Sequence, residues 1–340
     1  MIFAVRPSMT LLLGLVLSFA LCSSLSAQDT SHFEFLDPLF GLSQSYDLRS
    51  MILAAHPESD AEEMGGMRFL NLGNDEEYLC IVEASERYFA KIYCFGVIRD
   101  QSSGGNIVDL SYDGSGPIDI QHPDGSISQE FERADLGFTP GPGGHDFISI
   151  YYDKIGLAQW LQASDGRPKL NVVHYMDVEN IFDDGAYGLA FSNIIQDPGT
   201  GHGMLFATVY DAMVEIPLIP SGSVYDIDYG NVRFLCNLDS SSLTIGDLRL
   251  IQGGAYANDY VVTEYSDNGI YILDIDESTG YPVGVDGSTH VPYMLPYTPD
   301  TDLHADGPMC PLRRIINPGP TFSSWGAAFD EQTGGMLLSS

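Results

Sequence analysis

One sequence unit recurs along this chain, and a recurring unit constrains a fold more strongly than composition does. Each copy begins with a short apolar strand that contains an aromatic residue or leucine, often just after a glycine. A turn-rich loop follows, and then a strong strand, a tight turn and another strand. In the clearest copy these three strands are residues 248–250, 259–265 and 270–274.

Four further copies can be aligned on the aromatic or leucine residue of the short strand. The resulting anchor residues are Phe69, Phe138, Phe191, Leu250 and Phe329. A four-stranded propeller blade needs about 40–50 residues, and the wider spacing of the anchors predicts long connecting loops. Stretches such as 171–176 and 231–236 can supply a fourth strand. The last copy ends at Ser340 before its outer strands. Either the N-terminal segment from Phe33 to Leu53 closes that blade, or the chain is a fragment with an incomplete last blade.

The apolar pattern separates the possible β architectures. Strands such as 204–209 and 270–273 are almost continuously apolar, whereas a sandwich strand alternates between apolar and polar residues. Continuous runs are typical of strands that are covered on both faces. A parallel sheet would also give such runs, but it requires amphipathic helices between its strands, and the sequence has no convincing series of them. We therefore predict an all-β protein, a β-propeller of five or six blades.

Two stretches carry a resemblance to known propeller families. Residues 260–276 resemble the blade core of NHL proteins, of gluconolactonase-like (senescence marker protein) members and of the LVIVD repeat, and residues 326–334 resemble an inner strand and its turn. The gluconolactonase-like resemblance implies a metal-dependent lactonase or esterase with calcium on the axis. The other two imply binding or scaffold modules. The glutamate that the lactonase pattern needs has no counterpart here, because Glu62 and Glu63 lack the flanking motif.

The N-terminus predicts export. Arg6 precedes an apolar run over residues 11–21, and small residues lead up to Gln28, which is the pattern of a secretory signal peptide. The alternative is a membrane anchor, but a span needs about 20 apolar residues, and no later stretch is long enough. We predict a signal peptide over 1–27, an N-terminal segment over 28–60 and the propeller over 61–340. The protein would then be secreted and extracellular, or periplasmic in a bacterium.

Four cysteines follow the predicted signal peptide, and an even number in an exported chain permits two disulfides. Cys80 and Cys94 are equidistant from Arg87, so a hairpin that turns at Arg87 would place them opposite each other. Buried free thiols are the alternative. The spacing of the cysteines matches no zinc pattern.

The chain is strongly acidic, with a formal net charge of −33. Such a charge repels nucleic acid, and the sequence has no basic patch that could bind a phosphate backbone. The charge suits solubility, cation binding or a cationic partner.

Carboxylates recur at corresponding positions of the units. Three aspartates follow a strand that ends in tyrosine, and the loops that enter the inner strands carry more. These loop residues are Asp60, Glu62, Glu63, Asp135, Asp183, Asp184 and Asp247. Carboxylates gathered around one axis could bind Ca²⁺, although aspartate also favours tight turns for conformational reasons. The predicted metal ligands are Asp183, Asp184, Asp153, Asp211 and Asp267.

Motifs for catalysis are missing from the sequence. There is no nucleophile elbow, no His-Glu-x-x-His and no P-loop. Trp160 and Trp325 could line a ligand surface or belong to the core. We predict a secreted binding or scaffold module for an unknown ligand or extracellular protein. The alternative is a Ca²⁺-dependent, lactonase- or esterase-like hydrolase with a carboxylate metal site on the propeller axis.

Overall fold

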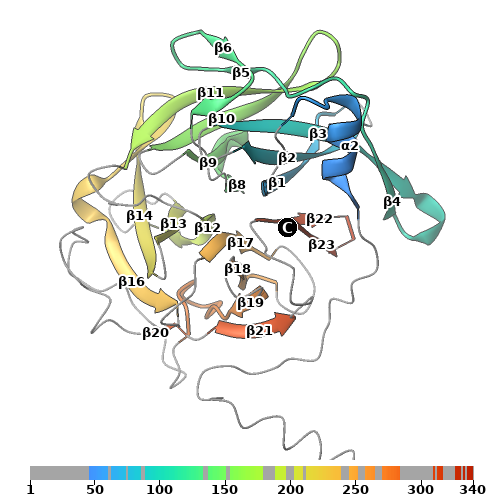
Figure 1. Cartoon of the computed structure of the whole chain (residues 1–340). Coiled ribbons are helices and arrows are strands. Elements are labelled where there is room, and N and C mark those ends of the chain that lie inside the picture. The colour runs from blue at the N-terminus through green and yellow to red at the C-terminus, as the bar shows by residue number, and fades with distance from the viewer. Residues whose placement is uncertain are drawn as a thin grey trace, which may run out of the picture.

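The structure is a computed structural model, and its strands form sheets around a central axis (Figure 1). The residues that it describes are 46–59, 63–73, 76–85, 89–132, 137–150, 154–178, 188–196, 203–209, 212–238, 245–251, 257–264, 270–283, 309–310, 312–316, 326–330, 332–333 and 335–339. No helix within these ranges has the length and apolar character needed to cross a membrane.

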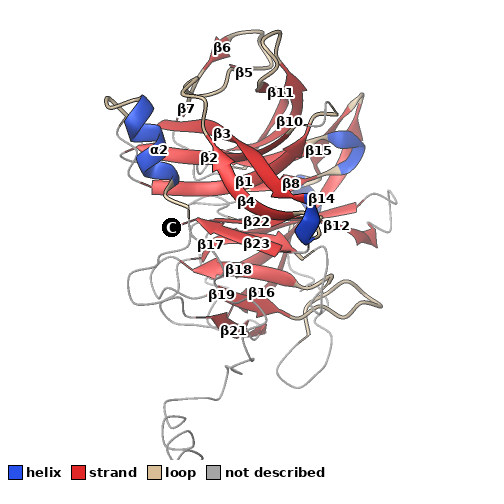
Figure 2. Cartoon of the chain, turned by 90° about the vertical axis from the view of Figure 1, so that its right-hand side faces the viewer, coloured by secondary structure: helices blue, strands red, loops and turns tan. Residues whose placement is uncertain are grey.

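The first blade is antiparallel, with strands in the order β1-β2-β3-β4 and with β7 paired to β3. The helix α2 (Leu48–Ala55) packs on this blade through Ile52 (Figure 2). The strands of the first blade are β1 (Glu63–Asn71), β2 (Glu77–Ser85), β3 (Phe89–Asp100), β4 (Asn106–Ser111) and β7 (Phe131–Glu132).

The second and third blades each have six strands, and each receives one outer strand in parallel from a different part of the chain. The second blade contains β8 (Phe138–Pro140), β9 (Asp146–Ile150), β10 (Lys154–Gln162), β11 (Pro168–Asp177), β5 (Ile120–Gln121) and β6 (Ile127–Ser128). The third contains β12 (Leu189–Gln196), β13 (Gly203–Val209), β14 (Ala212–Ser221), β15 (Val224–Ile227), β16 (Arg233–Leu238) and β20 (Met309–Cys310).

The fourth blade is followed by a smaller sheet, which we call the last sheet. The fourth blade contains β17 (Ile245–Leu250), β18 (Tyr260–Glu264), β19 (Ile270–Leu273) and β21 (Leu312–Ile316), and the last sheet contains β22 (Gly326–Asp330) and β23 (Gly335–Ser339). Three single turns of 3-10 helix lie in loops: η1 (Gln101–Ser103), η2 (Pro142–Gly144) and η3 (Tyr229–Asn231).

The first strand of each sheet lies innermost, so that β1, β8, β12, β17 and β22 surround the axis in chain order (Figure 1). Apolar layers fill the spaces between neighbouring sheets. Between the second and third blades, for example, Phe147 and Leu157 pack with Leu189 and Leu205. Because each sheet is covered on both faces, its strands carry the continuous apolar runs that the sequence shows.

The prediction of an all-β propeller is therefore confirmed. The described strands form four blades of four or more strands, and the last sheet has two strands and lies between the fourth and first blades. The stretches 171–176 and 231–236 do supply strands, as parts of β11 and β16. The parallel outer strands β5 and β20 were not predicted, because a two-residue strand leaves no periodic pattern in a sequence.

Two glycines allow the inner strands to approach closely. A Cβ atom on Gly188 would lie 2.4 Å from the backbone nitrogen of Leu248, and one on Gly326 would lie 2.5 Å from the carbonyl oxygen of Gly65. These distances are too short for any side chain, so glycine is needed where one blade meets the next. The glycine that often precedes the short strand of the repeat thus has a packing role.

Two disulfides join neighbouring strands. Cys80 and Cys94 lie directly opposite each other on β2 and β3, which confirms the predicted pairing. Cys236 of β16 is bonded to Cys310 of β20, across 74 residues of sequence. This second bond holds the short parallel strand at the outer edge of the third blade.

Arg99 of β3 joins the first blade to the last sheet. Its Nη1 and Nη2 donate to the two carboxylate oxygens of Asp330 at 2.7 and 2.8 Å. The same guanidinium also donates to Glu77 of β2 and to the Gly105 carbonyl. The side chains of Arg99 and Asp330 are both 5% exposed, so water screens this pair weakly.

The ion pair between Arg99 and Asp330 leads to a prediction about stability. Asp330→Ala leaves the Arg99 charge buried with only Glu77 as counterion, so the free energy of unfolding should fall by about 3 kcal/mol. Urea denaturation measures this loss, and limited proteolysis should show earlier release of the C-terminal residues. Asp165→Ala is the matched control, because Asp165 forms an exposed pair with Arg167 and should change stability little. Equal losses of stability in both variants would contradict the idea that the Arg99–Asp330 pair holds the last sheet on the first blade.

Candidate functional site

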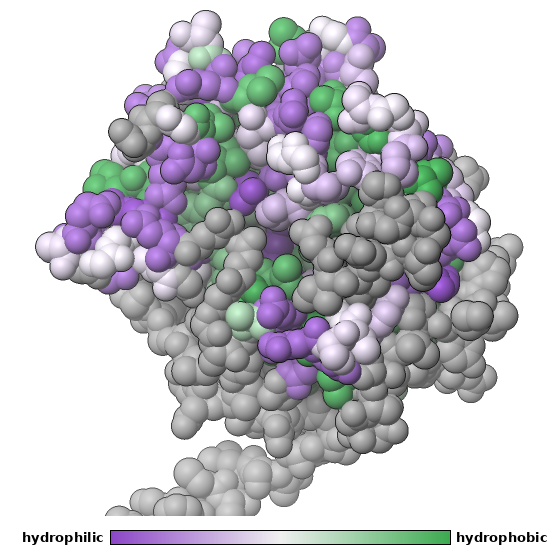
Figure 3. All heavy atoms as spheres, turned by 180° about the vertical axis from the view of Figure 1, so that it is seen from behind, coloured by the Kyte–Doolittle hydropathy of each residue, from purple (hydrophilic) through white to green (hydrophobic). Residues whose placement is uncertain are grey.

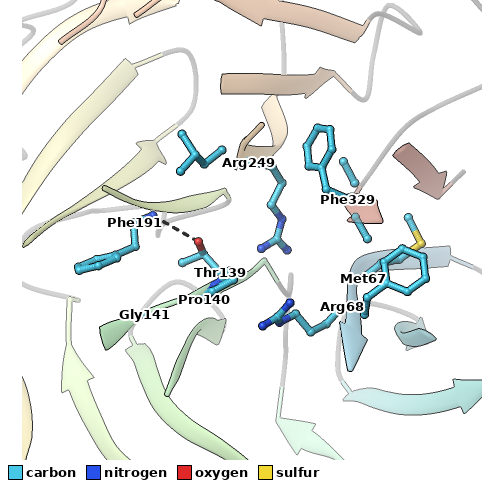
Figure 4. A pocket seen from close by; sticks show the side chains of 12 residues that line it. Met67, Arg68, Thr139, Pro140, Gly141, Phe191, Arg249 and Phe329 are labelled. Atoms are coloured by element: carbon cyan, nitrogen blue, oxygen red, sulfur yellow. Dashed lines mark hydrogen bonds between the residues drawn. The ribbon is translucent and has the colours of Figure 1, made fainter. Parts of the chain in front are cut away.

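A cavity of about 150 Å³ lies on the axis, where all five inner strands meet (Figure 4). Residues 67–69 of β1, 139–141 at the end of β8, Phe191 of β12, 249–250 of β17 and 327–329 of β22 line it. Viewed from behind, the space-filling surface is hollowed near its middle, with hydrophilic and hydrophobic residues both at the recess (Figure 3). The wall of the cavity is polar and apolar in similar measure, and its charged members among the described residues are two arginines.

Arg249 is the more buried of these arginines, with 6% of its side chain exposed. Its Nε donates to Asp247 Oδ2 at 2.9 Å. The two residues are two positions apart on β17, and side chains at that spacing share one face of a strand. The Nη2 atom of Arg249 is buried and has no hydrogen-bond partner within the part of the chain that the structure describes. A buried guanidinium donor without a partner is costly, and this one belongs to a side chain that lines the cavity.

Asp247 holds Arg249 in place and also reaches the last sheet. Its Oδ1 accepts from the backbone N–H of Leu248 at 2.9 Å, and its Oδ2 accepts from the backbone N–H of Ala327 on β22 at 3.3 Å. Burial raises the pKa of Asp247 to about 6, although the charge of Arg249 acts in the opposite direction. Burial likewise lowers the pKa of Arg249, so the surroundings disfavour charge on both partners.

Arg68 approaches the cavity from β1. Its Nε donates to Asp146 Oδ2 at 2.8 Å, and Trp160 Nε1 donates to the same oxygen at 2.9 Å. Trp160 thus orients the carboxylate that orients Arg68. The Arg68 side chain is 22% exposed. Its guanidinium points toward that of Arg249 across the cavity (Figure 4).

Charges of opposite sign are therefore separated around the cavity. The carboxylates of Asp146 and Asp247 hold the arginines but do not line the cavity wall, whereas both arginines do. Repulsion between Arg68 and Arg249 contributes to the lowered pKa of Arg249. A group that enters this space meets N–H donors and positive charge, with aromatic and aliphatic side chains beside them. The arrangement is suited to binding an anionic group.

The structure places one of the predicted loop carboxylates, Asp247, elsewhere than expected. Asp247 was predicted to lie in a loop at one end of the axis, but it lies within β17, buried against Arg249. The five predicted metal ligands, Asp153, Asp183, Asp184, Asp211 and Asp267, lie outside the described residues. Within the part of the chain that the structure describes, no group of three metal-ligating side chains comes together.

The two arginines of the cavity belong to no known motif, but their positions in the repeat distinguish them. Four of the five anchor residues of the repeat line the cavity: Phe69, Phe191, Leu250 and Phe329. Arg68 and Arg249 each come one residue before an anchor, and the other three units have glycine or alanine there. Two charged residues at a repeat position that is otherwise small stand out once the units are aligned.

The fold and the geometry of the cavity define a propeller with an arginine-lined axial site. Comparison with known proteins does not narrow this class, because the chain matches no protein-family model and no curated protein.

The raised pKa of Asp247 predicts a pH effect on stability. The folded value of about 6 lies above the ordinary value near 3.9, so folding favours the protonated acid. The stability that protonation contributes is present at low pH and is lost as the pH rises through 6. Relative to Asp247→Asn, the wild type should lose about 2 kcal/mol of unfolding free energy between pH 4 and pH 7.

Urea denaturation of both proteins over this pH range measures the difference. Asp165→Asn is the control: hydrogen bonds from Arg167 lower the pKa of Asp165, so its difference curve should slope the opposite way. Parallel curves for the wild type and Asp247→Asn would contradict the assignment of Asp247.

Proposed function

We propose that this protein is an exported binding module that holds a small anionic ligand in the axial cavity. The observation that carries the proposal is the buried Nη2 of Arg249, a charged donor without a partner among the described residues, in a side chain that lines the cavity. A bound acidic group would satisfy this donor. Hydrogen bonds to charged groups are worth about 1.5–3 kcal/mol.

Other features agree with the proposal. The blade core resembles NHL and LVIVD repeats, whose members are mostly binding or scaffold modules. Two disulfides are typical of chains that fold in an oxidising compartment, which supports export and the predicted signal peptide. The net charge of −33 disfavours anions at the surface in general, so an anionic ligand needs a local positive site, and the axial cavity provides one.

The second hypothesis, a Ca²⁺-dependent hydrolase, stays a prediction that rests on aspartates outside the described residues. At the level of Arg68 and Arg249 the two guanidinium groups repel a divalent cation. A calcium site on the same axis would have to lie away from this level.

Thermal unfolding in the presence of simple anions tests the proposed function. Acetate, benzoate, sulfate and phosphate would be compared at constant ionic strength, so that general salt effects cancel. At least one anion should raise the melting temperature with saturation, and at 100 times its dissociation constant it should add about 2.7 kcal/mol of stability. Arg249→Met should abolish this effect.

Arg167→Met is the matched control, because it removes an exposed arginine of the second blade and should leave the effect intact. The double variant Asp247→Asn with Arg249→Met guards against misfolding, since it removes both charges of the buried pair together. Stabilisation that persists in both Arg249 variants would contradict the proposal.

A further inference from the structure

We infer that the ligand of the axial cavity is a monocarboxylate with an apolar body about as large as a benzene ring. This inference rests on the proposed function and names the chemical class of the ligand. Four properties of the cavity support it: its hydrogen-bond donors, the charges around it, its lining and its volume.

The donors favour a carboxylate. Asp247 accepts from Nε of Arg249, and no described residue accepts from the buried Nη2. A planar guanidinium pairs in plane with a carboxylate, whose two oxygens can each accept a hydrogen bond. Arg68 is already held by Asp146 through Nε and, at 3.5 Å, through Nη2. Arg68 therefore contributes its charge and any remaining N–H donors, and Arg249 contributes the buried donor that lacks a partner among the described residues.

The charge balance favours one negative charge over two. The charged groups around the cavity are Arg68 and Arg249, with Asp146 and Asp247 behind them. These charges cancel formally, but the arginines line the cavity and the carboxylates lie behind them. One negative charge on the ligand can pair with Arg249, whereas a second would have no uncompensated positive charge to pair with. A phosphate group carries about −1.5 to −2 charges near neutral pH, and the acidic surface of the protein opposes it further. A carboxylate brings one charge, and its oxygens can accept from the buried Nη2 of Arg249.

The apolar part of the wall suits an apolar body. Phe69, Phe191, Leu250 and Phe329 line the cavity beside the arginines. Contact with aromatic and aliphatic side chains is favourable only for apolar ligand surface, at about 25 cal/mol per Å² removed from water. An inorganic anion or a small hydroxy acid would leave this wall unused.

The volume sets the size of the body. The cavity measures about 150 Å³, and an engineered protein cavity of about 150 Å³ holds one benzene molecule. Benzoate therefore serves as the probe. Its ring matches the volume, and its carboxylate would lie toward Arg249.

Isothermal titration calorimetry of the full chain with matched probes tests the inference. The probes are benzoate, benzamide as the uncharged analogue, acetate as the carboxylate without a body, and inorganic phosphate. Benzoate should bind at least about tenfold more tightly than benzamide, because the amide oxygen still accepts a hydrogen bond but brings no negative charge to pair with the guanidinium. It should also bind at least about tenfold more tightly than acetate, because acetate leaves the apolar wall uncovered. Phosphate should give no saturable heat.

The outcomes separate this inference from the proposed function. Saturable binding of phosphate, or of acetate as tightly as benzoate, would overturn the inference and leave the proposed function standing, provided that Arg249→Met abolishes it and Arg167→Met does not. Equal affinity for benzoate and benzamide would overturn both, because binding would then not depend on charge. No binding of any anion would also overturn both. The comparison of the four probes needs only the wild type, so it stands even where Arg249→Met does not fold.

Discussion

The buried carboxylate of Asp247 connects two parts of the molecule that a ring-shaped fold must keep together. It accepts a backbone hydrogen bond from Ala327 of the last sheet and a side-chain hydrogen bond from Arg249. The first of these contacts helps to seat the last sheet on the fourth blade. The second aims a guanidinium at the axis. Closure of the ring and the geometry of the cavity therefore depend on the same residue.

The other side of the last sheet is held by a different device. Arg99 and Asp330 form a paired, buried contact with the first blade, and the glycine at position 326 lets β22 lie directly against β1. The last sheet has only two described strands, so its apolar contacts with its neighbours are fewer than those between full blades. Its position is fixed by the ion pair between Arg99 and Asp330 and by the hydrogen bond from Ala327 to Asp247. Apolar packing alone would constrain it less.

The two buried arginines differ in a way that bears on function. Arg99 donates hydrogen bonds to Asp330, Glu77 and the Gly105 carbonyl, as expected of a residue that stabilises the fold. Arg249 is equally buried, but its Nη2 has no partner in the described ranges. Burial of a charge is favourable only when its hydrogen bonds are satisfied. This contrast is the reason to regard the axial cavity as a binding site.

The sequence by itself determined the class of fold. The repeat, the continuous apolar strands and the glycine before the short strand all reflect local requirements of a covered blade, so they can be seen in the order of residues. The pairing of Cys80 with Cys94 was also accessible, because a hairpin is a local structure. Only the tertiary structure decided which side chains meet on the axis. Arg68 and Arg249 are 181 positions apart in the chain, and ring closure brings them to one cavity. The tertiary structure also decided that Asp247 pairs with Arg249. Asp247 is buried because neighbouring blades cover β17, and this burial cannot be read from the sequence of the strand itself.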